Sequence, residues 1–162
     1  MGLDMYLYER KREHFWQPEK TALALAFARD VMDIDIDRQA GNPSHVTMDF
    51  EVGYWRKANA VHGWFVSNIQ GGVDNCEEHP VSLEQLTELR RVCQQVLENH
   101  ELAPDLLPPT QGFFFGGNEM GEYYFEQLKQ TVEIINRLEV DYVQDRLSES
   151  AWDRDFFYVA SW

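Results

Sequence analysis

Apolar and polar residues alternate in three short stretches of the chain, which is the pattern of strands with one buried face. Residues 3–8 form the first stretch. Residues 32–37 and 46–52 form the other two, and they flank the turn-rich segment at 40–45, which contains Gly-Asn-Pro. Two alternating runs around such a turn predict a β-hairpin at about residues 31–52, with one apolar face and one acidic face.

Apolar residues recur at helical spacing in three longer stretches. The first predicts a helix over about residues 54–68. The second begins after Ser82, which together with Gln85 has the spacing of an N-terminal capping box. The third begins near residue 122. A shorter Ala/Leu-rich stretch after Pro18 also fits a helix, with proline in its first turn.

Two further apolar runs predict strands. GFFFG at 112–116 is bounded by glycines and indicates a short buried strand, and the run at 156–161 indicates a last one. Strands and helices follow no regular βαβ order, so the pattern predicts an α+β fold with an antiparallel sheet of four or five strands packed against three helices. With 162 residues, of which 44% are apolar, the chain fits a single domain over 1–162.

The charge of the chain restricts its partners. There are 28 acidic and 14 basic residues, which gives a formal net charge of −14. DNA, RNA and anionic lipid would be repelled unless a local basic patch dominated, so no direct binding to nucleic acid or membrane is expected. A protein with a basic surface would be attracted instead.

Cysteine content and hydropathy indicate a cytoplasmic protein. Cys76 and Cys93 are the only cysteines, and neither belongs to a C-x-x-C or zinc-type arrangement. We therefore expect no disulfide framework, no structural metal site formed by cysteines and no cofactor. No apolar run is long enough to span a bilayer, and the N-terminus lacks the charged-then-apolar order of a signal peptide.

The acidic face of the predicted hairpin is a candidate binding surface. It consists of Asp33, Asp35, Asp37, Asp49 and Glu51. Like charges opposed across a strand pair are destabilising unless a cation or a basic partner lies there. Alternate residues of a strand recur at about 6.6–6.8 Å, close to the phosphate spacing along one nucleic-acid strand, so mimicry of a phosphate ladder is one interpretation. A bound divalent cation is a second, and a solvated face that discourages edge aggregation is a third.

The segment from Gly53 to Val73 contains no acidic residue in this acidic chain. On the helix predicted there, His62 falls among apolar residues with Asn59 at the edge of the same face. His62 is therefore either a core histidine bonded to a carbonyl or hydroxyl, or a ligand-binding group at the mouth of a pocket. Trp64 falls on the polar side, close to Arg56 and Lys57. An exposed tryptophan beside cations is typical of an interaction hot spot, unless a neighbouring loop covers it.

Catalytic motifs are sparse. The sequence contains no Gly-x-Ser-x-Gly, P-loop, His-Glu-x-x-His or Rossmann fingerprint, so no catalytic residue is assigned. Cys76 and His79 lie in a short cluster with acids, but their spacing defines no oxyanion site. A small enzyme or ligand-binding protein remains an alternative, with a pocket formed by Asn59, His62, Asp74, Tyr123 and Tyr124.

Four segments resemble a family of small proteins encoded by bacteriophages and prophages. They are MGLDMYLYE at the start, VGYWRKANAVHGWFV at 52–66, QGGVDNCEEHPVS at 70–82 and GFFFG at 112–116. Where the relatives tend toward Gly-Glu-Tyr-Tyr, this chain has Glu77-Glu78-His79-Pro80, so the resemblance implies no role for that turn. It implies expression in the cytoplasm of an infected bacterium and assigns no molecular activity.

We therefore expect a phage or prophage accessory protein that binds a host protein without catalysis. The host protein would belong to a defence system or to the nucleic-acid-handling machinery and would present a basic surface to the acidic face. The small enzyme or ligand binder described above is the alternative, and a structure distinguishes the two by the presence or absence of a deep polar pocket.

Overall fold

The chain divides into two compact units. The computed structural model describes residues 2–14, 18–31, 33, 45–112, 115–147 and 155–162. Met1–Glu9 and Phe50–Trp162 form the first unit, and Arg10–Asp49 form the second. That the chain is a single domain stays a prediction.

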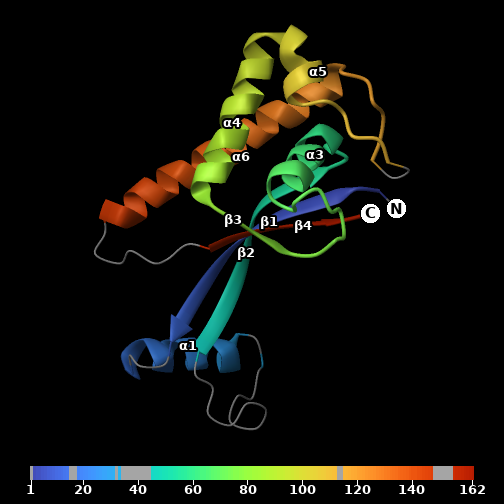
Figure 1. Cartoon of the computed structure of the whole chain (residues 1–162). Helices are drawn as coiled ribbons and strands as arrows, with labels where there is room; N and C mark the ends of the chain where they lie inside the picture. The colour runs from blue at the N-terminus through green and yellow to red at the C-terminus, as the bar shows by residue number, and fades with distance from the viewer. Residues whose placement is uncertain (1, 15–17, 32, 34–44, 113–114, 148–154) are drawn as a thin grey trace. The chain divides into compact units, whose positions relative to one another are not determined.

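The described strands form one antiparallel sheet with the order β2-β1-β4-β3 (Figure 1). β1 covers Asp4–His14, β2 His45–Arg56, β3 His79–Val81 and β4 Asp155–Ser161. With the helices this is an α+β fold, as predicted. The strands predicted at 3–8, 46–52 and 156–161 are all present within this sheet.

Helices cover one side of the sheet in the first unit. They are α3 (Asn59–Asn68), α4 (Leu83–Glu98), the 3-10 helix η1 (His100–Leu102), α5 (Ala103–Leu106) and α6 (Glu122–Leu147). Figure 1 shows α3, α4 and α6 on the same side of the strands. In the second unit, the helix predicted after Pro18 is present as α1 (Pro18–Asp30).

The core lies between the sheet and these helices. Alternate residues of β1 and β4, together with Leu3 just before β1, are buried there, namely Leu3, Met5, Leu7, Phe156, Tyr158 and Ala160. Phe65 of α3 stacks on Tyr158, with ring centroids 3.8 Å apart and planes 6° apart. The apolar residues of the alternation predicted for β1 are therefore the ones that face the core, because every second side chain of a strand points to the same side of the sheet.

The start of α4 is fixed locally, as the sequence predicted. The backbone N–H of Gln85 donates to the Ser82 hydroxyl, and the Ser82 N–H donates to the Gln85 side chain, which completes the capping box. Two backbone donors at the helix end are satisfied in this way.

The helix predicted at 54–68 begins later than expected. β2 continues to Arg56, and α3 starts only at Asn59. Trp55 is buried as a strand residue, and Tyr54 on the opposite face is exposed. The chain leaves the strand at Lys57, whose φ of 56° neither a strand nor a helix accommodates.

The strand predicted at 112–116 is wrong for the residues that the structure describes there. Gly112, Phe115 and Gly116 lie in irregular backbone, and Gly116 has a φ of 93°. Residues 113 and 114 lie outside the described part. The fourth strand is instead β3, which pairs antiparallel with β4, Pro80 facing Phe157. Three residues are too few to show an alternating pattern, so β3 had no signal in the sequence.

The hairpin prediction also needs correction. Its second strand lies within β2, but Met48 and Phe50 are 36% and 47% exposed, so the apolar face assigned to it is not buried. In the described sheet the neighbour of β2 is β1. Of the predicted first strand only Asp33 is described, as an exposed residue with a φ of 53°, and residues 32 and 34–44 lie outside the described part.

Candidate functional site

His62 is the centre of a buried polar chain. The side chain is 0% exposed, and its Nδ1 lies 2.7 Å from the Tyr158 hydroxyl while Nε2 lies 2.9 Å from Asp74 Oδ2. A carboxylate oxygen accepts, so Nε2 carries a hydrogen and donates to Asp74, and in the neutral imidazole Nδ1 accepts from the Tyr158 O–H. These bonds connect α3, the loop after it and β4. The structure therefore places His62 in the core, where it joins three segments.

The burial of Tyr158 gives a pH-dependent stability. Burial raises the pKa of Tyr158 well above its ordinary value of 10. A raised pKa means that the folded protein holds the phenol proton more tightly than the unfolded chain does. The stabilisation is therefore complete below pH 10 and is lost as the pH rises from 10 toward the folded-state pKa, by about 1.4 kcal/mol per pH unit.

We accordingly expect Tyr158→Phe to have a smaller loss of stability with alkaline pH than the unaltered chain. Urea unfolding at a series of pH values on both sides of 10 measures this. Tyr124, which burial also shifts upward in pKa, keeps its own contribution in both proteins. Identical alkaline slopes for the two proteins would show that the Tyr158 phenol is not protected as described.

Cys76 lacks the environment of a nucleophile. Partial burial raises the pKa of its thiol, a hydrogen bond with the backbone of Trp162 lowers it, and the nearby Asp74 raises it again, for a net increase. Reactive cysteines have a lowered pKa, because the thiolate is the nucleophile. Both ring nitrogens of His62 are engaged with Tyr158 and Asp74, so neither activates this thiol.

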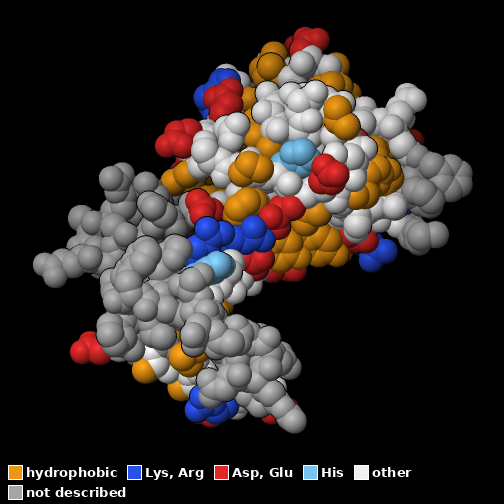
Figure 2. Space-filling view, turned by 60° about the horizontal axis from the view of Figure 1, so that its bottom comes forward, with side chains coloured by type: hydrophobic (Ala, Val, Ile, Leu, Met, Phe, Trp, Pro, Cys, Tyr) orange, Lys and Arg blue, Asp and Glu red, His pale blue; other side chains and the backbone are white. Residues whose placement is uncertain are grey.

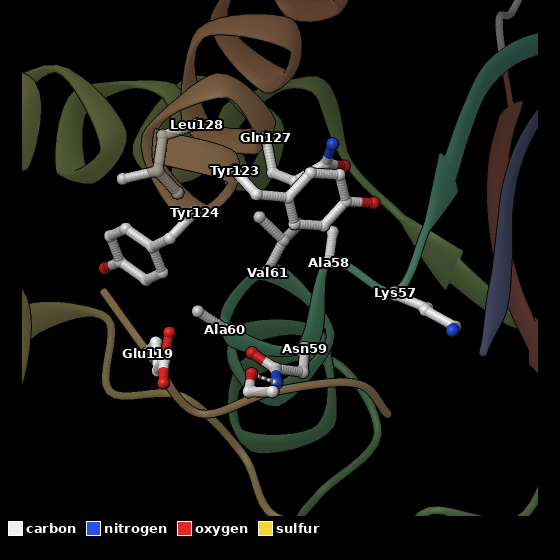
Figure 3. Close-up of a pocket in the computed structure, with 11 residues that line it drawn as sticks. Lys57, Ala58, Asn59, Ala60, Val61, Glu119, Tyr123, Tyr124, Gln127 and Leu128 are labelled. Carbon is white, nitrogen blue, oxygen red and sulfur yellow. Dashed lines mark hydrogen bonds between the residues drawn. The ribbon is translucent and has the colours of Figure 1, made fainter. Parts of the chain in front are cut away.

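The residues of the predicted alternative pocket separate into two places. Asn59, Tyr123 and Tyr124 line a hollow beside the start of α3, whereas His62 and Asp74 belong to the buried chain and do not line it (Figure 3). The hollow has a volume of about 30 Å³, room for about one or two water molecules. Asn59 Nδ2 donates to the Gly117 carbonyl at 3.0 Å, and both residues line the hollow. The deep polar pocket that the alternative requires is not formed by these residues.

Tyr123 has a structural contact that the sequence did not indicate. Three side chains of α6 at seven-residue spacing donate to carbonyls of β2: Tyr123 to Arg56, Gln130 to Tyr54 and Arg137 to Val52. β2 is an edge strand of the described sheet, and an unpaired edge invites pairing with other chains. This part of the edge is covered by α6.

Of the two interpretations given for Trp64, the exposed hot spot is wrong, and the structure agrees with the other, a tryptophan that a neighbouring loop covers. Trp64 is only 9% exposed, and its ring packs edge-on against Phe65 with centroids 5.5 Å apart. The segment around Thr110 passes directly against α3 beside it, because a Cβ placed on Gly63 would lie 2.1 Å from Thr110 Oγ1. The loop after α5 therefore packs on the side of the helix that the sequence pattern left to solvent.

Arg56 and Lys57 do not form one surface with Trp64. Arg56 ends β2 with a largely exposed side chain, and its Nε lies 3.9 Å from Asp4 Oδ1. Lys57 lies in the turn before α3 and lines the hollow there. The cations predicted beside an exposed tryptophan thus flank a strand end instead.

The predicted acidic face is only partly described, and one of its carboxylates is engaged. Asp49 accepts two hydrogen bonds from Arg10, at 2.7 and 2.8 Å, and this contact lowers the pKa of Asp49. Glu51 and Asp33 are exposed, and Asp35 and Asp37 lie outside the described residues. Because β1 contributes basic residues beside β2, this region is not the uniformly acidic surface that β2 alone predicted.

A larger acidic surface lies in the helical layer. The 37 residues from Val92 to Leu128 contain six acids and no Lys or Arg, and this charge asymmetry was a signal that sequence reasoning missed. All six acids are exposed: Glu98, Glu101, Asp105, Glu119, Glu122 and Glu126. They belong to the end of α4, to η1 and α5, to the loop that follows, and to the start of α6. We call these six residues the acidic end.

Packing brings the segments of the acidic end together. The ring of His100 in η1 stacks on Phe125 of α6 with centroids 3.8 Å apart, and the Tyr124 hydroxyl donates to the Leu107 carbonyl at 2.8 Å. Figure 1 shows α5 beside the first turns of α6. Carboxylates that lie more than twenty residues apart in the sequence therefore share one end of the helical layer.

Within the described residues, no group of three or more His, Cys, Asp or Glu side chains is arranged to hold a metal ion. None of the described helices combines the length and the apolar character that crossing a membrane requires. Comparisons with models of protein families, with curated proteins and with solved structures found no match to this chain.

Proposed function

We propose that this protein is a non-catalytic binding protein that recognises a basic surface of a host protein through its acidic end. The observation that carries the proposal is the gathering of six exposed carboxylates, without a Lys or Arg in the same segments, at one end of the helical layer. The resemblance to proteins of phages and prophages supplies the setting, an infected bacterial cell. The acidic end takes the role that the sequence pattern assigned to the hairpin face.

The charge of the acidic end acts at long range. A chain of net charge −14 attracts basic partners, and a cluster of carboxylates with no Lys or Arg in its own segments directs the encounter to one side of the molecule. The C-terminus of α4 carries Glu98 and no basic residue in its last turn, so the negative end of the helix dipole adds to the carboxylates.

Apolar side chains at the same end provide short-range contact. Leu106 of α5 is 37% exposed, and Tyr123 at the start of α6 is 52% exposed. Apolar and aromatic groups surrounded by charges are typical of interface centres with a polar rim. The partner we expect therefore presents lysine or arginine residues around a small apolar contact.

A charge-reversal series tests the proposal. A tagged chain is used to capture proteins from a bacterial lysate, and the captured proteins are quantified with the unaltered chain, with the triple variant Glu101→Lys, Glu122→Lys, Glu126→Lys, and with a control. The control, Glu51→Lys, Glu133→Lys, Asp141→Lys, changes the net charge equally with exposed residues elsewhere.

We expect the first variant to lose a specific partner that the control retains. Capture should weaken as salt rises, because exposed charge pairs are screened over about 8 Å at physiological ionic strength. Equal capture by the two variants would refute the acidic end as the contact surface, and so would capture that is indifferent to salt.

A further inference from the structure

The side of the sheet that faces away from α3, α4 and α6 carries a cluster of tyrosines. The rings of Tyr6 and Tyr8 stack with centroids 6.0 Å apart, and the ring of Tyr6 lies 5.3 Å from that of Tyr54 on the neighbouring strand. In the first unit, every described helix lies on the other side (Figure 1). Figure 2 shows hydrophobic side chains gathered on this part of the surface. We call Asp4, Tyr6, Tyr8, Val52, Tyr54 and Arg56 the tyrosine face.

The tyrosine face is neutral in a strongly acidic molecule. It contains one acid, Asp4, and one base, Arg56, whose ionic atoms lie 3.9 Å apart. The Tyr54 hydroxyl donates to the same Asp4 oxygen. The side chains of Asp4 and Arg56 are 25% and 62% exposed, so both are accessible to a second molecule. Two molecules of net charge −14 repel each other, but contact between these faces brings no net charge together.

The arrangement of the tyrosine face is self-complementary. Tyr6 and Asp4 lie on β1, and their neighbours Tyr54 and Arg56 lie on β2. A two-fold axis that runs between these strands, parallel to them, exchanges β1 of one molecule with β2 of the other. It places Tyr6 over Tyr54 of the second copy and Asp4 over Arg56 of the second copy. An isologous contact requires such matching of a patch with itself.

We infer that the tyrosine face binds a second copy of this chain, sheet against sheet, to form a two-fold symmetric dimer. This goes beyond the proposed function, which uses the acidic end. Sheets pack face to face at about 10 Å, with the tyrosine rings filling the space between them. The six residues of the tyrosine face offer a smaller area than the roughly 800 Å² per partner of standard interfaces, so the dissociation constant should be of the order of micromolar.

Sedimentation equilibrium of the full chain tests the dimer. Arg56→Glu places a carboxylate opposite Asp4 of the second copy, and Asp4→Arg places a guanidinium opposite Arg56 of the second copy, twice in each dimer. Either change alone should raise the dissociation constant about a hundredfold. Arg91→Glu and Asp141→Arg, on exposed helix positions, make the same changes in charge and should have little effect.

Mixing the two variants gives the decisive result. In a mixed dimer, Asp4 of the Arg56→Glu chain faces Arg56 of the Asp4→Arg chain, and the introduced carboxylate faces the introduced guanidinium. An equimolar mixture should therefore dimerise although neither variant does alone. If Asp4 and Arg56 acted only as an ion pair within one chain, mixing would not restore dimerisation, because each variant chain would still lack that pair. A mixture of folded variants that stays monomeric overturns the inference, as do variants that dimerise like the unaltered chain.

Salt provides a second measurement on the unaltered chain. Higher salt screens the repulsion between two acidic molecules and favours apolar contact, so dimerisation should strengthen or hold between about 0.05 and 0.5 M salt. Dissociation of the dimer by salt, or a monomer at every concentration and salt tested, overturns the inference. Capture of a basic partner should instead weaken as salt rises. The two measurements can therefore refute the dimer and the proposed function separately.

Discussion

Replacing Trp55 with alanine should lower the free energy of unfolding by about 3–5 kcal/mol. The indole is completely buried, and its Nε1 donates to the Thr131 hydroxyl at 2.9 Å. It packs beside Phe65, with ring centroids 6.1 Å apart. The alanine variant loses this contact between β2, α3 and α6 and leaves a cavity that the close-packed surroundings fill only in part. Urea unfolding followed by circular dichroism measures the effect.

Trp55→Phe and Trp162→Ala serve as controls for this prediction. The phenylalanine keeps most of the ring volume and loses only the bond to Thr131, which still donates to the Gln127 carbonyl, so the loss should be about 1–2 kcal/mol. Trp162 at the chain end is only half-buried, and its removal should cost less than that of Trp55. If Trp55→Ala and Trp162→Ala proved equally stable, Trp55 would not hold the helices on the sheet as described.

Replacing His62 with alanine should lower the free energy of unfolding by about 2–4 kcal/mol. The change removes two hydrogen bonds and leaves both partners behind, the buried Tyr158 hydroxyl and Asp74 Oδ2. Asp74 Oδ1 already lacks a hydrogen-bond partner among the described residues. Without His62, neither oxygen of the Asp74 carboxylate would have a partner there. A buried polar group without a partner costs more than the lost bond contributed. Urea unfolding at neutral pH measures the difference.

His100→Ala is the matched control, since His100 is exposed and contributes a stacking contact with Phe125. Its loss should be about 1 kcal/mol. The variant pair His62→Ala and Asp74→Ala should be less than additive, because each removes the same bond. A His62→Ala protein as stable as the His100→Ala protein would contradict the buried chain and favour a histidine that serves a ligand.

The two proposed surfaces are compatible with each other. The tyrosine face lies on the side of the sheet away from α3, α4 and α6, and the acidic end lies among the helices of the same unit. A dimer through the tyrosine face would carry two acidic ends. A partner with repeated basic sites would then bind both ends, and the second contact would form at a high effective concentration.

Local patterns in the sequence were sufficient for several elements. β1 follows from period-2 alternation, β4 from an apolar run, α4 from its capping box, and α6 from a long apolar stripe. Each depends on interactions between residues a few positions apart, which the sequence displays directly. The sequence also identified His62 as an apolar-face histidine, and it showed the charge balance that disfavours polyanionic partners.

Other features depended on residues far apart in the chain. The partners of His62 lie 12 and 96 positions away, so their convergence could not be predicted from spacing. The segment at about 54–68 fits a helix by periodicity, yet the contact of Trp55 with Thr131 keeps its first part in the sheet. The loop around Thr110 buries the side of α3 that the helix pattern assigned to solvent.

The sequence by itself determined the class of fold, the positions of its most regular elements and the acidic character of the molecule, because propensity, periodicity and charge are local or additive properties. Tertiary structure decided where β2 ends, which three residues form β3, and which side of α3 is covered. It also decided which carboxylates are engaged, like Asp49 with Arg10, and which gather at the acidic end. These outcomes depend on packing between distant segments, where each side chain's environment is set by neighbours that the linear order does not reveal.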